Sequence, residues 1–190
     1  MTATTFETSL ARRAEPTLQT AAGRVLTLAG AVFGLSNLFQ YGVQSGVLHL
    51  HEATLALRWP VAVTAFIVIL RRLRAVGGEA GRRTAGWSRL GILTMIGSAL
   101  TLLALSLALQ DFSLMFWMTP VGMGMYALAW ATAAVRTRRV WMAGQAVGAL
   151  CIVGLTITLL GTPAQYLIYA IGLLAFAFTP GVFMILSDKA

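Results

Sequence analysis

The sequence is poor in charged residues and has one cysteine and one lysine. Only 11% of its 190 residues are charged, whereas 58% are apolar and the mean hydropathy is +0.79. Soluble domains carry about 25% charged residues, so this scarcity excludes a soluble globular fold. The single Cys151 excludes a disulfide framework, a CxxC redox pair and a thiolate zinc site. The only lysine, Lys189, follows the last apolar run, which excludes a Schiff base inside the membrane.

Recognisable catalytic motifs are absent as well. No GxSxG elbow or Walker loop occurs in a suitable setting. None of the six acidic residues lies deep in an apolar run, although intramembrane proton relays use buried Asp, Glu or His. Both histidines, His49 and His51, lie close together, whereas b-type haem needs histidines on facing helices. We therefore expect no cofactor and no catalytic constellation.

What the sequence does contain is a series of long apolar runs. A membrane-crossing helix needs about 20 mostly apolar residues to cover a hydrocarbon layer of about 30 Å. The runs predict an all-α polytopic membrane protein, in which six transmembrane helices pair as three hairpins over residues 24–190. We expect residues 1–23 to form a mobile cytoplasmic tail. The predicted spans cover residues 25–48, 54–70, 90–109, 115–135, 140–160 and 163–186.

The basic residues cluster before the first span, in alternate links and after the last span. Arg58 alone lies on the other side. Arginine-rich links stay in the cytoplasm, so both termini are predicted to be cytoplasmic. Anionic lipid headgroups, rather than nucleic acid, are the expected partners of these side chains. The predicted headgroup contacts are Arg71, Arg72, Arg74, Arg82, Arg83, Arg89, Arg136, Arg138 and Arg139.

A polar stripe runs along the first span. Asn37, Gln40, Tyr41 and Gln44 recur at intervals of three and four residues and therefore share one helix face. Because unpaired amides in lipid cost several kcal/mol, this face is expected to point into the bundle or into a wet cavity. An interhelical hydrogen-bond seam explains the same pattern. The alternative is an outward polar vestibule that adds His49, His51, Glu52 and Asp111 from the outer loops, with Arg58 and Gln110 close to them.

The outer histidines also form an incomplete candidate metal site. His49, His51 and Glu52 offer imidazole and carboxylate ligands, which suit zinc or copper. On a helix, two residues separated by one position diverge by about 200°, so both histidines would ligate only from a loop or strand. Asp111 or a water would have to complete the set, and ordinary interfacial residues are the alternative.

Small residues indicate where helices approach closely. Glycines four residues apart open a groove for another backbone. The partner is either a neighbouring span or a second copy of the chain. The candidate helix-packing or dimer contacts are Gly30 with Gly34, Gly42 with Gly46, and Gly144 with Gly148.

Prolines mark kinks and a helix start. Pro120 and Pro180 lie inside spans, where each removes a backbone donor, and Thr119 or Thr179 can satisfy the freed carbonyls. The last span begins with a T-x-x-Q pattern that predicts a capping box, with proline in the first helical position. Its residues are Thr162, Pro163 and Gln165.

Three short segments carry a resemblance. They are Trp59-Pro60-Val61-Ala62, Leu70-Arg71-Arg72-Leu73, and Gly161-Thr162-Pro163 followed by Gln165-Tyr166-Leu167. The chain resembles a group of small, uncharacterised, multi-spanning bacterial inner-membrane proteins over roughly residues 25–186. The resemblance implies a bacterial inner membrane and supplies no activity, substrate or catalytic residue.

Three functions follow as expectations. The first is a non-catalytic membrane protein that acts by binding, as an accessory or sensory subunit or as a small-ligand binder, alone or within a homodimer or larger complex. The second is a small transporter or channel, dimeric, whose path is lined by Asn37, Gln40 and Gln44. The third is a metal-dependent membrane enzyme at the outer surface, which would use His49, His51, Glu52 and Asp111.

Overall fold

The computed structural model describes residues 17–76 and 78–188, with side chains except at residues 74, 76 and 78–90. Every regular element within these ranges is helical. In chain order the elements are α2 (Leu18–Gln44), α3 (Thr54–Val76), α4 (Gly78–Leu109), the 3₁₀ helix η1 (Phe112–Trp117), α5 (Met118–Thr137), α6 (Val140–Thr158), α7 (Pro163–Leu173), the π-helical turn η2 (Leu174–Phe178) and α8 (Thr179–Ser187).

Six helical segments in these ranges are long and apolar enough to cross a membrane, which confirms the prediction of an all-helical fold with six candidate membrane spans. Large apolar side chains cover much of the outer surface, as lipid contact requires. The six segments are Leu18–Gln44, Thr54–Leu73, Gly91–Leu109, Phe112–Thr137, Val140–Thr158 and Pro163–Ser187.

The first helix begins earlier than the sequence predicted. Thr17 caps α2, because its side-chain oxygen accepts a hydrogen bond of 3.2 Å from the Thr20 backbone N–H. Residues 18–23, predicted as the end of a mobile tail, therefore form the first turns of α2 and bury Ala21 and Gly23. The tail prediction is wrong for these six residues, and residues 1–16 lie outside the described part. The helix also ends at Gln44 rather than at residue 48.

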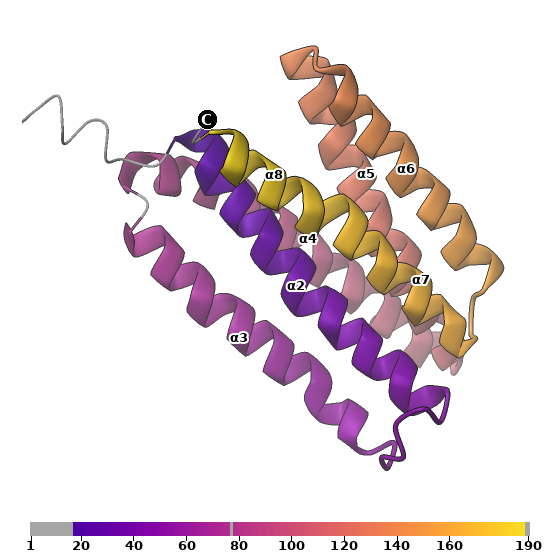
Figure 1. Ribbon diagram of the computed structural model, residues 1–190. Coiled ribbons are helices and arrows are strands. Elements are labelled where there is room, and N and C mark those ends of the chain that lie inside the picture. Colours follow the sequence, from indigo (N-terminus) through magenta and orange to yellow (C-terminus); the bar gives the residue numbers. More distant parts are fainter. Residues whose placement is uncertain (1–16, 77, 189–190) are drawn as a thin grey trace, which may run out of the picture.

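The start of α2 is tied to the end of α8. The Asp188 carboxylate accepts hydrogen bonds from the hydroxyls of Thr17, at 2.6 Å, and Thr20, at 2.5 Å. These two donors hold the pKa of Asp188 below its usual value. The two helix ends consequently lie side by side, as Figure 1 shows.

Helix α2 is the centre of the bundle and packs against α3, α4, α7, η2 and α8 (Figure 1). Glycine makes its closest approaches possible. A Cβ on Gly30 would lie 2.4 Å from the backbone nitrogen of Phe178, and one on Gly23 would lie 2.7 Å from the Gly181 carbonyl oxygen. A Cβ on Gly34 would lie 3.3 Å from the Leu174 side chain. The predicted Gly30–Gly34 groove is therefore filled by η2 of the same chain.

Of the other glycines predicted to make close contacts, two pack against the chain and two do not. A Cβ on Gly148 would meet the Phe176 ring at 2.4 Å, and one on Gly42 would meet Leu48 at 2.7 Å. No described atom lies within 4 Å of a Cβ placed on Gly144 or Gly46, and Gly46 has a φ of +76° beyond the end of α2. Gly148 thus packs within the chain, whereas Gly144 does not.

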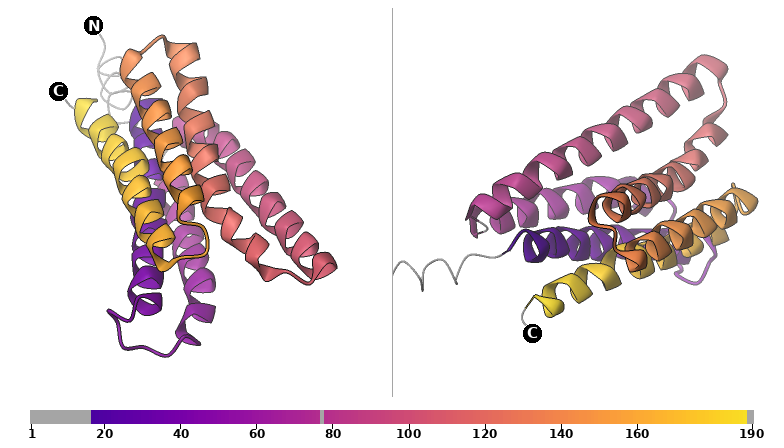
Figure 2. Two further views of the ribbon diagram at one scale, coloured as in Figure 1. Left: turned by 90° about the vertical axis from the view of Figure 1, so that its right-hand side faces the viewer. Right: turned by 90° about the horizontal axis from the view of Figure 1, so that it is seen from above.

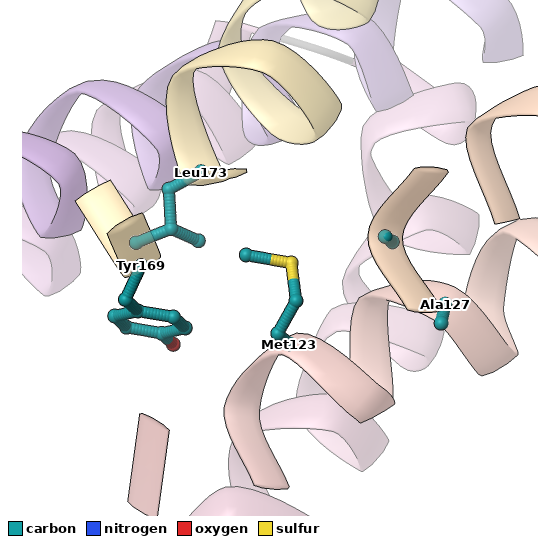
Figure 3. Close-up of a cluster of buried hydrophobic side chains, with 5 residues drawn as sticks. Met123, Ala127, Tyr169 and Leu173 are labelled. Atoms are coloured by element: carbon teal, nitrogen blue, oxygen red, sulfur yellow. The ribbon is translucent and has the colours of Figure 1, made fainter. Parts of the chain in front are cut away.

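One packed core joins α5, α6 and α7. Met123 and Ala127 on α5 contact Ala149 on α6 and Tyr169 and Leu173 on α7 (Figure 3). By contrast, α4 is the span that buries the smallest share of its residues, although it contacts α2, α3 and α5. Figure 2 shows α4 and η1 along one side of the bundle, diverging from α7 and α8. Most of the described side chains of α4, in Gly91–Leu109, are therefore free to meet lipid.

Pro120 lies where η1 meets α5. It cannot donate to the Phe116 carbonyl, because its nitrogen carries no hydrogen. The hydroxyl of Thr119 donates to this carbonyl at 3.3 Å, as predicted, and Nε2 of Gln165 on α7 donates at 2.6 Å. The carbonyl is therefore bonded from its own helix and from a neighbouring one.

Pro180 has a matching effect in the last span. It cannot donate to the Phe176 carbonyl, which instead accepts a hydrogen bond of 2.7 Å from the indole Nε1 of Trp130 on α5. The predicted donor, Thr179, bonds the Leu174 carbonyl at 2.9 Å within the π-helical turn. The fourth and sixth spans thus each donate a side-chain hydrogen bond to the carbonyl that a proline of the other span leaves free. Gln165 on α7 donates to Phe116 in η1, and Trp130 on α5 donates to Phe176 in η2.

We predict opposite effects of alanine at two glycines. Gly144→Ala removes backbone freedom without a clash and should leave stability unchanged or raise it by up to about 1 kcal/mol. Gly30→Ala forces a methyl group against the Phe178 backbone and should cost about 1–3 kcal/mol. Reversible unfolding in mixed micelles measures both. Equal stabilities would show that the Gly30 contact is not close.

Candidate functional site

A cavity of about 220 Å³ lies between α2, α3, α4, η1, α5 and α7. Its polar lining residues are Asn37, Gln40, Arg58 and Thr119. Its aromatic lining residues are Trp59, Phe116, Tyr166 and Tyr169, and three methionines complete the walls: Met95, Met115 and Met118. The cavity therefore combines a few polar groups with a mostly apolar wall, which is typical of a small-molecule site.

The cavity is close to one end of the bundle. Arg58 is in the second turn of α3, Thr119 is in the first turn of α5, and Tyr166 is in the first turn of α7. At 1.5 Å per residue these positions lie within about 6 Å of the helix ends. Figure 1 shows the start of α3 and of α7 at the opposite end of the bundle from the end of α8.

Arg58 is the most unusual group in the cavity. Its Nη1 donates to Oδ1 of Asn37 at 3.3 Å, and its guanidinium carbon lies 5.0 Å from the centre of the Trp59 ring. Its Nε is buried and has no hydrogen-bond partner. Among the residues that the structure describes, no carboxylate forms an ion pair with Arg58. The guanidinium is thus only partly hydrogen-bonded, and no described carboxylate neutralises its charge.

The two amides of α2 meet the cavity in different ways. Nδ2 of Asn37 donates to the Phe33 carbonyl at 2.7 Å, which turns the amide oxygen towards Arg58. The side chain of Gln40 is buried, and its Oε1 has no hydrogen-bond partner. The site therefore holds one buried donor atom and one buried acceptor atom that are both unpaired.

Gln165 fixes the wall formed by η1 and α5. The residue is fully buried, and its Nε2 donates to the Phe116 carbonyl and to the Thr119 hydroxyl. Its Oε1 accepts from the Gly161 backbone N–H at 2.9 Å. Since Phe116 and Thr119 both line the cavity, one amide of α7 holds that wall in place.

The start of α7 is only partly as predicted. Pro163 occupies the first turn, as expected. The capping box is wrong, because the Thr162 hydroxyl donates to the Leu159 carbonyl at 2.7 Å and makes no cap hydrogen bond. Gln165 is drawn away from the cap by the Phe116 carbonyl that Pro120 leaves free.

The structure divides the predicted vestibule. Asn37 and Gln40 line the cavity, whereas the other six residues do not. The physical reason is that α2 ends at Gln44, so its polar face does not continue towards His51. Tyr41 is half-buried on α2, and the rest are exposed at the end of the helix or in loops: Gln44, His49, His51, Glu52 and Asp111.

The candidate metal ligands do not assemble. In the described ranges no three His, Cys, Asp or Glu side chains are grouped closely enough to hold an ion. Nδ1 of His51 accepts a local hydrogen bond of 3.1 Å from the Ala53 N–H. Asp111 caps η1 by accepting from the Ser113 N–H at 2.9 Å, and bonds from Ser113 lower the pKa of this carboxyl.

The arginines predicted to contact lipid headgroups are exposed wherever their side chains are described. These are Arg71, Arg72, Arg136, Arg138 and Arg139. The side chains of Arg74, Arg82, Arg83 and Arg89 lie outside the described part of the chain. The contrast with half-buried Arg58 separates the guanidinium at the cavity from those at the surface.

Sequence reasoning missed Arg58 as an interior residue, together with Thr119, Tyr166 and Tyr169 as cavity residues. One signal was available. Arg58 is the only basic residue inside a predicted span, and intramembrane charges usually face a cavity or the bundle interior. Nothing comparable marks the tyrosines, because they reach the cavity only through the packing of α7.

No protein-family model, curated protein or solved structure matches this chain. The residues that line the cavity are therefore the basis for its proposed ligand.

We predict that Gln165→Met lowers the stability of the bundle by about 1–3 kcal/mol, because it leaves the Gly161 N–H unpaired and removes a donor from the Phe116 carbonyl. Gln110→Met is the control, since Gln110 is exposed and bonds only locally to Leu107. Unfolding in mixed micelles measures both variants. A Gln165→Met protein as stable as the control would contradict the role given to Gln165.

Proposed function

We propose that this protein is a non-catalytic integral membrane protein that binds a small ligand in the cavity beside Arg58, as a binding or sensory subunit. One observation carries the proposal: Arg58 Nε and Gln40 Oε1 are both buried without a partner in residues that line the same cavity. Leaving such atoms unpaired costs about 1–3 kcal/mol each, and more for a charged group. A bound ligand offsets that cost.

The size of the cavity supports a small ligand. An apolar cavity of about 150 Å³ holds benzene, and pockets for drug-sized molecules span about 300–1,000 Å³. At about 220 Å³, the cavity suits one ring or a short chain with a polar substituent.

Packing favours binding over conduction. Tyr169 belongs both to the cavity wall and to the core formed with Met123 and Leu173. A second cluster of Ala29, Phe66 and Leu70 fills the space between α2 and α3. A continuous polar path would have to cross these apolar layers, so the cavity fits a binding site better than a channel.

The proposed setting is a bacterial inner membrane with both termini in the cytoplasm. The exposed arginines near the end of α3, Arg71 and Arg72, and those around the α5–α6 link support this orientation, because basic residues are retained on the cytoplasmic side. The cavity then lies near the outer face.

Binding is tested by native mass spectrometry of protein purified from its host membrane. We expect a small non-lipid adduct on the wild type and on Leu128→Trp, which alters an exposed position of α5. Met118→Trp, which fills the cavity from the same helix, should lose that adduct. An adduct that survives in Met118→Trp would place the ligand elsewhere, and its absence from the wild type would contradict occupancy in the membrane.

Orientation is tested with single cysteines in a Cys151→Ala background. A membrane-impermeant maleimide should label Ser45→Cys, in the exposed loop after α2, on intact cells. It should label Thr137→Cys, at the end of α5, only after permeabilisation. The reverse labelling pattern would show that the orientation is opposite to the proposed one. Labelling of both cysteines on intact cells would contradict the placement of Ser45 and Thr137 on opposite sides of the membrane.

A further inference from the structure

We infer that the ligand is a small organic acid with a flat apolar body, and that its carboxylate is held by Arg58. The inference rests on the proposed function and narrows it to one chemical class. Its basis is the position of the Arg58 guanidinium beside the cavity.

Arg58 does not behave like an arginine that merely anchors a helix in the interface. It lies only about 6 Å from the start of α3, a distance that its side chain could span to reach water. Instead the guanidinium turns inward and donates to Asn37 on α2. An inward charge in a membrane is costly and marks a functional group.

The surroundings hold the guanidinium in one orientation. The Trp59 ring lies 5.0 Å from its central carbon, and the Asn37 oxygen that it bonds is itself fixed through Phe33. A planar guanidinium presents five N–H donors and binds a carboxylate through two parallel hydrogen bonds. Asn37 accepts from Nη1, and the buried Nε remains unpaired.

No described acidic residue supplies the missing charge. Glu52 and Asp111, on the loops at this end, are exposed, and the Asp111 carboxylate already bonds Ser113. An anion from outside the chain is therefore the group that completes the site. The unpaired Gln40 Oε1 adds an acceptor for a hydroxyl or N–H on the same ligand.

The walls select the rest of the ligand. Aromatic rings of Trp59, Phe116 and Tyr166 and the thioethers of Met115 and Met118 line the same space. Aromatic faces and polarisable sulfur pack well on a flat ring. A volume of about 220 Å³ accommodates one substituted ring and is too small to hold a whole phospholipid.

The experiment compares benzoate with benzamide, which have nearly the same shape and differ in charge, and adds 4-hydroxybenzoate. Protein in nanodiscs is titrated with each compound at neutral pH, and binding is measured by calorimetry. We expect benzoate to bind at least tenfold more tightly than benzamide. 4-Hydroxybenzoate should bind more tightly again, with that gain lost in Gln40→Leu.

Two variants separate a specific site from general attraction. Arg58→Gln should abolish the preference for benzoate over benzamide, whereas Arg71→Gln, at an exposed position of the same helix, should retain it. Arg58→Lys keeps the charge but loses the paired hydrogen bonds, so it should keep only part of the preference. Far-UV circular dichroism and unfolding in mixed micelles check that each variant is folded.

The outcomes distinguish this inference from the proposed function. Equal binding of benzoate and benzamide would overturn the assignment of an anion while leaving a small-ligand site in place. Failure of all three compounds to bind would overturn the ligand class, and the mass-spectrometric adduct then decides whether any ligand site remains. An adduct identified as an anionic phospholipid would also overturn the inference.

Discussion

A hydrocarbon layer contains no water to pair with a freed carbonyl or a buried charge. In this bundle, side chains of one span donate hydrogen bonds to backbone carbonyls that a proline leaves without a donor in another span. Gln165 on α7 bonds the carbonyl that Pro120 releases, and Trp130 on α5 bonds the one that Pro180 releases. The exchange ties together two spans that are separated in sequence by α6.

The same exchange shapes the cavity. By bonding Phe116 and Thr119, Gln165 fixes two of the lining residues on a 3₁₀–α junction that would otherwise have free backbone groups. On the other side, Gly30 lets η2 approach α2 closely. The polar atoms around Arg58 therefore belong to packed helices and not to loops. Packed helices hold the groups of a binding site in position more precisely than loops do.

The arginines of this chain have two different roles because of where their side chains end. Those whose side chains are described, near the end of α3 and around the α5–α6 link, are exposed, and their charge supports the proposed orientation in the membrane. Arg58 does not belong to these clusters of basic residues. Its guanidinium lies inside the bundle, where it contacts the Trp59 ring and donates a hydrogen bond to Asn37. Burying a guanidinium without a counter-ion is unfavourable for folding, so the inward position of Arg58 supports the proposed ligand site.

The sequence by itself determined the helical class and the approximate spans, because both follow from the spacing of apolar and charged residues along the chain. It also predicted that Asn37 and Gln40 share a polar helix face, because that depends only on their spacing within one helix. Only the tertiary structure decided which residues surround them. Arg58, Thr119 and Tyr166 come together because glycine contacts and proline-released carbonyls set how the helices pack, and these pairings join residues far apart in the chain.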